Sequence, residues 1–137
     1  MDRKRLFKIL AYLIILIFLV NYVAVKLYWY NSIWYFDMIM HFLGGFWLSL
    51  ALLWLFFKKD LSLKLIFKIF LGVLLIGVLW EVYEILVNNT FAQNPFNTLD
   101  TISDIFFDLS GGVFAILYFL KRTMLLKENK VNPGVEL

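Results

Sequence analysis

The sequence predicts an all-α protein, a bundle of four transmembrane helices, and three observations lead to this fold class. Hydrophobic residues make up 63% of the 137 positions, more than a soluble domain of this size could bury. Four apolar segments are each long enough to cross a hydrocarbon core of about 30 Å at about 1.5 Å per residue. If successive segments cross the membrane in alternating directions, all 13 Lys and Arg residues except Lys26 lie at or near the segment ends on the same side of the membrane.

The expected helices, in order, cover about residues 6–25, 37–57, 65–87 and 100–120. Together they form one transmembrane domain, residues 1–120, and a short polar cytoplasmic tail follows at 121–137. The first apolar run comes after the basic start MDRKR, but it is too long for a signal-peptide core, and no small-residue cleavage motif follows it. We therefore expect this segment to be retained as a helix.

The basic residues also predict an orientation. They lie before the first helix, around the connection between the second and third, and after the fourth, whereas the connection NNTFAQNPFNT has none. The positive-inside rule then places both termini in the cytoplasm of a multi-pass protein of the bacterial or archaeal inner (cell) membrane. Aromatic residues at 28–30 and 34–35 fit an interfacial belt on the outer side. Topology thus accounts for most of the positive charge, and we expect no nucleic-acid partner.

Ionisable residues gather in the outward halves of the second, third and fourth helices. The candidates for catalytic or metal-binding residues are Asp37, His41, Glu81, Glu84, Asp104 and Asp108. Spacings of three or four residues put the members from each helix on one face. Counted from the helix ends, all lie at depths of about 5–10 Å. A charge at the centre of a membrane helix costs about 2.5–3.5 kcal/mol, so such groups face the bundle interior. We expect them to converge in one cavity.

Structural roles compete with a functional role for several of these residues. The segment from Thr101 to Asp104 fits a capping box, and Asp100 suits the first turn of a helix. Asp37 could equally be a helix-start acid. A lone histidine such as His41 would more often be a packed side chain than a ligand. Asp108 lies beyond the first turn, so capping explains it poorly.

Several acids in one cavity cannot all stay ionised without compensation. No Lys or Arg lies in the outer halves of these helices, so either some acids are protonated or a cation sits among them. Carboxylates and an imidazole suit a divalent metal ion such as Mg²⁺, Mn²⁺, Fe or Zn²⁺. The lack of cysteine excludes thiolate ligands, and the single histidine excludes a three-histidine zinc site. The chain also lacks the D-x-x-D-G-x-x-A-R start of the CDP-alcohol phosphotransferases.

An internal echo links the second and fourth helices. Residues 37–45, DMIMHFLGG, and residues 104–112, DIFFDLSGG, both follow the pattern D-x-x-x-[HD]-x-x-G-G. This pattern indicates two helical hairpins related as a parallel repeat. The paired glycines let helix backbones approach closely, which would bring the acids of the two helices together.

Taken in order, FDMIMHFLGG, WEVYE and DTISDIFFDLSGG resemble the VanZ-like group of small integral membrane proteins. The likeness covers about Asp37 to Gly112; the segment NPFNTL lacks an arginine expected there, and Asp108 stands where an asparagine is common. The name-giving members of the group are associated with resistance to the glycopeptide teicoplanin. The resemblance implies a site shared by the acids and the histidine of these helices.

Three functions stay open at this point. The first is an enzyme or binding protein whose acidic, metal-binding site acts on an envelope lipid or a lipid-linked precursor, with membrane lipids as its partners. The second is a cation or proton carrier that uses the acids as a relay. The inner halves of the helices favour a carrier less, because they are almost wholly apolar apart from Ser49. The third is a structural membrane subunit, and a homo-oligomer is compatible with all three.

Overall fold

The structure is a computed structural model that describes residues 3–56, 62–87 and 97–131. The helices are α1 (Arg3–Lys26), α2 (Trp29–Ser32), α3 (Phe36–Phe56), α4 (Leu63–Val87) and α5 (Thr98–Val131). The described residues contain no strand, and α1, α3, α4 and the 98–124 part of α5 are each long and apolar enough to cross a membrane. The predicted all-α bundle of four membrane helices is therefore confirmed.

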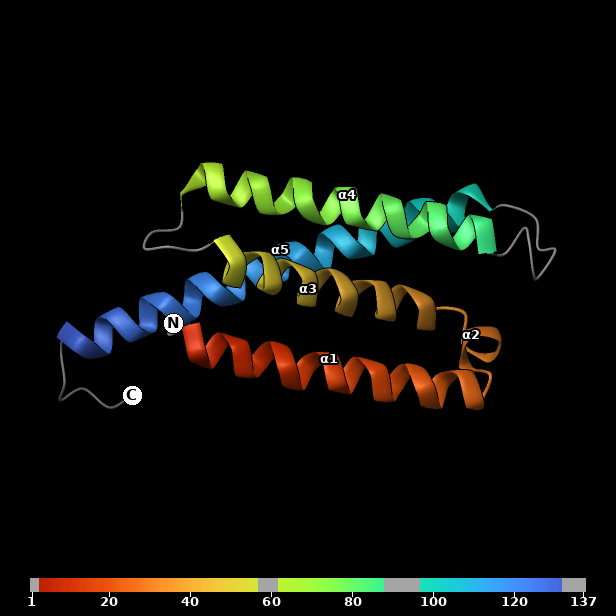
Figure 1. The fold of residues 1–137 in the computed structure, drawn as a ribbon, viewed down its shortest axis with the longest axis horizontal. Coiled ribbons are helices and arrows are strands. Elements are labelled where there is room, and N and C mark those ends of the chain that lie inside the picture. Colours follow the sequence, from red (N-terminus) through yellow and green to blue (C-terminus); the bar gives the residue numbers. More distant parts are fainter. Residues whose placement is uncertain (1–2, 57–61, 88–96, 132–137) are drawn as a thin grey trace.

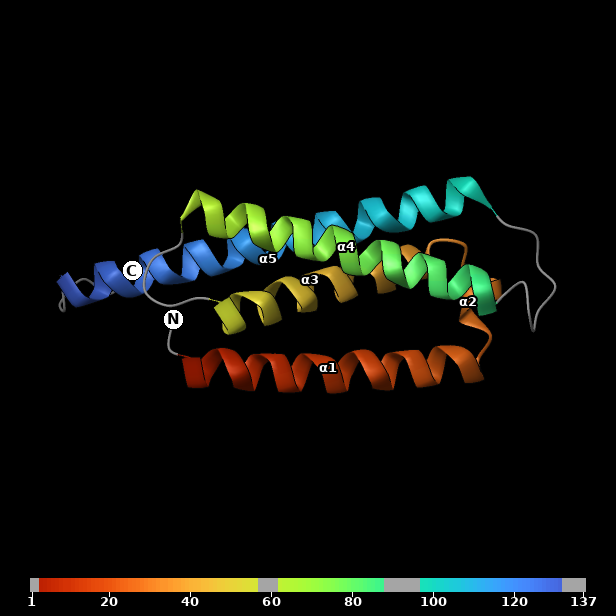
Figure 2. The same cartoon turned by 45° about the horizontal axis from the view of Figure 1, so that its top comes forward.

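The long helices lie side by side with alternating direction along the chain, so α3 and α5 run parallel (Figures 1 and 2). The contact between α3 and α5 is the most extensive in the bundle, α4 covers both of them, and α1 packs on α3. Within the described parts of the chain, the backbones of α1 and α4 do not approach each other. We call the end that carries α2 and the start of α5 the α2 end, and the opposite end the terminal end.

The helix boundaries lie within a few residues of the expected ones, with two exceptions. The short helix α2 was not expected, because its aromatic residues suggested only an interfacial belt. Tyr28, at φ 56°, is left-handed and turns the chain into α2, and the rings of Trp29 and Tyr30 pack edge-on against the buried Phe36. The sequence signal for this turn is weak, because tyrosine rarely adopts a positive φ.

The second exception is α5, which continues to Val131 rather than ending near residue 120. The prediction followed hydropathy, but leaving the apolar region does not by itself end a helix. The residues after 120 are mainly good helix formers, and the first helix breakers along the sequence are Pro133 and Gly134. About two thirds of the predicted polar tail, residues 121–131, is therefore helical, and residues 132–137 lie outside the described part of the chain.

Glycines bring α3 and α5 into backbone contact. A Cβ added at Gly45 would overlap the backbone carbonyl of Asp108, and a Cβ added at Gly111 would overlap that of Phe42. Only glycine permits this approach, which is the small-residue packing that holds membrane helices together. The prediction that the paired glycines let these two helix backbones approach closely is thus confirmed. Each helix supplies one of the two contacts, Gly45 from α3 and Gly111 from α5.

The apolar core fills the half of the bundle toward the terminal end. Its largest fully buried side chains are Leu50, Leu53, Ile69, Val73 and Phe119. Side chains that would be anomalous in a water-soluble protein cover the outside: Phe18 of α1 and Leu75 of α4 are 67% and 59% exposed. Such apolar outer faces are what a hydrocarbon surrounding requires. The buried polar groups therefore lie mainly in the other half of the bundle, toward the α2 end.

Candidate functional site

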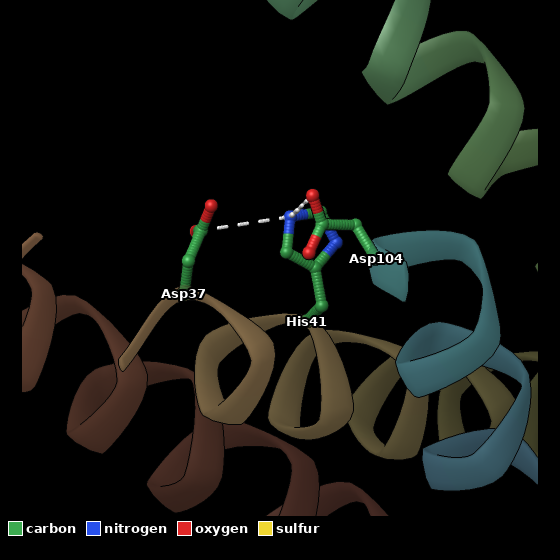
Figure 3. Close-up of side chains that lie close together, drawn as sticks. All are labelled: Asp37, His41 and Asp104. Atoms are coloured by element: carbon green, nitrogen blue, oxygen red, sulfur yellow. Dashed lines mark ion pairs between the residues drawn. The ribbon is translucent and has the colours of Figure 1, made fainter. Parts of the chain in front are cut away.

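His41 lies at the centre of the polar groups, on the second turn of α3, and is 7% exposed. Three carboxylates surround its Nε2 atom: Asp37 Oδ1 at 3.8 Å, Glu81 Oε1 at 3.9 Å and Asp104 Oδ2 at 4.0 Å. Figure 3 shows Asp37 and His41 rising from α3 while Asp104 reaches toward the imidazole from α5. One nitrogen atom is therefore nearly equidistant from acids of three helices.

A fourth carboxylate lies beside the other ring nitrogen of His41, Nδ1. Asp108 Oδ2 lies 3.4 Å from His41 Nδ1. The backbone contacts of the glycines explain this approach, because His41 directly precedes Phe42, whose carbonyl faces Gly111, while the carbonyl of Asp108 faces Gly45. The two nitrogens of one imidazole thus see different sets of acids, three carboxylates on Nε2 and one on Nδ1.

Two acids of the cluster are buried and have oxygen atoms without a hydrogen-bond partner among the described residues. Glu81 is 4% exposed and Asp104 3% exposed, and Glu81 Oε1 and Asp104 Oδ1 have no hydrogen-bond partner in the described part of the chain. Leaving a buried carboxylate oxygen without a partner is costly, so such groups call for a proton, a water molecule or a cation. Glu81 and Asp104 therefore each have one carboxylate oxygen that a bound ion or a proton would satisfy.

Two overlapping groups of side chains have donor atoms close enough to share one ion. Asp37, His41 and Asp104 form one group, and His41, Glu81 and Glu84 form the other, with all donor atoms of each group within 4.8 Å of one another. Glu84 is half-buried one turn nearer to the α2 end than Glu81. His41 is common to both groups, so it is the residue on which any shared ion would depend.

A further glycine shapes the site from α4. A Cβ added at Gly77 would lie 2.8 Å from Asp108 Oδ2, so a larger residue there would crowd the carboxylate. Gly44 is less critical, since its added Cβ would meet Asp108 Oδ1 at an ordinary 4.0 Å. The lack of side chains at these positions opens room around Asp108.

A cavity of about 390 Å³ adjoins the cluster, and Asp37, His41 and Asp108 form part of its wall. Its other walls come from α1 and α4, and Tyr30 of α2 lies at one end. The Tyr30 hydroxyl donates a hydrogen bond of 2.7 Å to Asn21 Oδ1 on α1. Burial raises the pKa of Tyr30 to about 12, and the charges of Asp37 and Glu84 contribute, so this phenol stays protonated and keeps donating.

The structure brings together all six residues that the sequence singled out. Their shared depth was the signal, and the structure gives it a geometric centre at His41. Asp100 is an exposed first-turn acid of α5 and belongs to neither group of donor atoms. The capping box expected at Thr101 to Asp104 is wrong, because α5 begins at Thr98 and the side chain of Asn97 accepts a hydrogen bond of 3.2 Å from the backbone N–H of Leu99.

Other parts of the site were missed or only touched on in the sequence. Tyr30 was expected only as a belt residue, and Asn21 was not singled out. Gly77 was not singled out, although an isolated glycine four residues before Glu81 could have indicated a close approach. The Ser110 hydroxyl donates a hydrogen bond of 2.8 Å to the backbone carbonyl of Phe106, within its own helix.

The fold and the buried polar centre define a class: an integral membrane protein of four long helices that holds a histidine among carboxylates. More particularly, the chain belongs to the family described as "Predicted membrane protein (DUF2238)", whose model matches residues 1–124. This match covers all four helices of the described chain that are long and apolar enough to cross a membrane. Searches of curated proteins and of solved structures gave no significant match.

Proposed function

We propose that the protein holds a divalent cation at His41 and that this site binds the phosphate or pyrophosphate group of an envelope lipid or a lipid-linked precursor. The observation that carries the proposal is the position of His41 Nε2, at 3.8–4.0 Å from carboxylate oxygens of Asp37, Glu81 and Asp104. An imidazole nitrogen and carboxylate oxygens converge there from three helices. Glu84 is within reach as a further ligand.

The donor set fits such an ion. Ligand atoms at about 2.1 Å from a tetrahedral metal lie about 3.4 Å apart, so each carboxylate would draw in by about half an ångström. Mixed imidazole and carboxylate ligands suit Mn²⁺, Fe, Zn²⁺ or Mg²⁺. Asp108 would then act through Nδ1, since metal-binding histidines commonly give their second nitrogen to a carboxylate that fixes the ring. A bound cation supplies Lewis-acid attraction for phosphate oxygens in a site that is otherwise acidic.

The proposal also includes the side of the membrane that the site faces. With the basic residues inside, the α2 end faces the extracytoplasmic side of the cell membrane. Cysteines placed at the exposed positions Asn31, in α2, and Met124, where the apolar part of α5 ends, would report this orientation. An impermeant maleimide applied to intact cells should label Asn31→Cys only, and labelling of Met124→Cys alone would place the site on the cytoplasmic side.

Binding is favoured over transport by what lies beyond the cluster. Toward the terminal end, the described residues form an apolar core in which Ser49 is the one buried polar side chain. A relay of protons or cations would need further polar groups there. A structural subunit gains no support from acids that are buried against their own histidine. The resemblance to the VanZ-like group supports the placement of the acids in the bundle.

The deciding experiment is metal analysis of purified protein, with two variants of α5 that differ by one helical turn. The parent, dialysed against trace Mn²⁺ or Zn²⁺ and then against metal-free buffer, should retain about one ion per chain by mass spectrometry. Asp104→Asn should lose it, because a buried ligand is neutralised, whereas Asp100→Asn should keep it, because Asp100 is exposed and outside the cluster.

Asp108→Asn should weaken metal binding by about 10- to 100-fold, the usual effect of removing a partner of a metal-bound histidine. A parent that retains no ion, or an equal loss in Asp100→Asn and Asp104→Asn, would exclude the proposed cation site.

A further inference from the structure

We propose that the ligand of this site is a phosphate-bearing lipid that enters sideways from the bilayer, between α1 and α4, and keeps the first part of its chain between these helices. The inference rests on the proposed function for its phosphate end. Its new content is the route of entry and the chain-binding groove. The groove is the cavity of about 390 Å³, bounded by α1 on one side and α4 on the other, with α3 as its floor.

Hydrogen bonds limit the cavity along the membrane normal. Toward the α2 end, the Tyr30 hydroxyl donates to Asn21 and ties α2 to α1. Toward the terminal end, Trp47 Nε1 donates a hydrogen bond of 2.9 Å to the backbone carbonyl of Leu10, one turn before the first α1 residue that lines the cavity, Ile14. Both ends are therefore bridged, and entry along the bundle axis is restricted.

The side between α1 and α4 carries no comparable bridge in the described chain. The backbones of these two helices do not come together, and Figures 1 and 2 show α3 between them. The exposed residues that border the cavity on this side are largely apolar: Phe18 of α1 is 67% exposed, and Ile76 and Trp80 of α4 are 42% and 55% exposed. The opening therefore leads to lipid chains rather than to water.

The lining of the cavity matches an amphiphile. The α1 and α4 walls present Ile14, Ile17, Phe18 and Ile76, whereas the floor carries Asp37 and His41. An apolar wall can pack against a hydrocarbon chain as lipid does, and the cation site would attract a phosphate. The volume is near the lower limit for ligand sites, so it suits a headgroup with the adjoining chain segment while the remaining chain stays in the bilayer. A free phosphate ion would contact only the cation site on the floor of the groove and would leave the apolar walls unused.

The test blocks the groove without touching the acids. Ile17 faces the cavity, and its neighbour Leu16 faces outward, so Ile17→Trp and Leu16→Trp are a matched pair. The proteins are placed in nanodiscs with Mn²⁺, and binding of dodecyl phosphate and of inorganic phosphate is measured against empty nanodiscs. Parent and Leu16→Trp should bind dodecyl phosphate at least about tenfold more tightly than inorganic phosphate. Ile17→Trp should lose this preference and keep its affinity for inorganic phosphate and its Mn²⁺ content.

A second blocking variant, Ile76→Trp on the α4 side, should behave like Ile17→Trp, and its Mn²⁺ content shows that the site is still folded. The groove is excluded if the parent binds both phosphates equally or does not bind dodecyl phosphate. It is also excluded if both blocking variants bind dodecyl phosphate as the parent does. A third outcome separates the two proposals. If the parent binds no Mn²⁺ but still prefers dodecyl phosphate to inorganic phosphate, and Ile17→Trp abolishes that preference, the cation site is overturned and the lateral groove is supported.

Discussion

The two halves of the bundle are built from the same helices but differ in what they bury. Toward the terminal end, α3, α4 and α5 enclose Leu50, Val73 and Phe119 with almost no polar atom. Toward the α2 end, the same helices enclose His41, Asp104 and three further acids beside a cavity. The apolar half is closed and fully packed, and the polar half is open on one side. The stability of the bundle and its chemistry are thus separated along the helix axes.

The backbone contacts of Gly45 and Gly111 lie between these halves. Helices in a membrane gain little from burying apolar groups, because lipid is equally apolar, so close packing has to hold them together. The glycines supply that packing at the level where α3 and α5 are nearest. They fix the apolar half and also set the spacing between His41 and Asp108. Substitutions at these positions should therefore affect both halves, and substitutions elsewhere only one.

The largest effect is expected where the two halves meet. Gly111→Ala places a methyl group on the backbone carbonyl of Phe42, which cannot move aside, so the free energy of unfolding should fall by about 3 kcal/mol. Gly72→Ala is the control, since its added Cβ meets only the end of the flexible Leu52 side chain, and it should change stability by less than about 1 kcal/mol. Thermal unfolding in detergent compares the two; equal losses would show that the close approach of α3 and α5 does not matter.

The next effect should separate the halves. Phe119→Ala opens a void in the apolar core, and the free energy of unfolding should fall by about 3 kcal/mol while metal content stays at the parent level. Asp104→Asn should do the reverse: in the presence of chelator it should unfold no more easily than the parent, because a buried carboxylate has been neutralised. Unfolding curves and metal analysis on the same samples give both readouts. A destabilised Asp104→Asn with full metal content would contradict the separation.

The smallest effect concerns the boundary of the open half. Tyr30→Phe removes the hydrogen bond to Asn21 and should lower the free energy of unfolding by about 1 kcal/mol. Because folding raises the pKa of Tyr30 from 10.0 to about 12, the unfolded chain ionises first. The parent should therefore lose stability as the pH rises through this window, and Tyr30→Phe should lose less. Stability measured from pH 9 upward checks the sign; identical slopes would show that the phenol is not protected.

Much of this arrangement could be predicted from the sequence. Length and hydropathy give the four spans, and the glycine pairs correctly indicate a close contact between the second and fourth of them. The matched depth of the acids was enough to expect that they meet. What the sequence could not give is which nitrogen of His41 each acid faces, since that depends on the rotation of α3 against α5. The part played by α1 was also hidden, because an apolar helix gives no sign of which face borders a cavity.

The pairing of α3 with α5 across the intervening α4 imposes an order on assembly. Helices enter the membrane as they are synthesised, so α3 arrives with Asp37 and His41 before α5 exists. Until α5 is inserted, Gly45 faces lipid instead of the backbone of Asp108, and the acids of α3 and α4 lack their enclosure. The last helix therefore completes both the packing and the polar centre in one step. A chain truncated after α4 would keep three membrane segments but would leave the acids of α3 and α4 without the helix that encloses them.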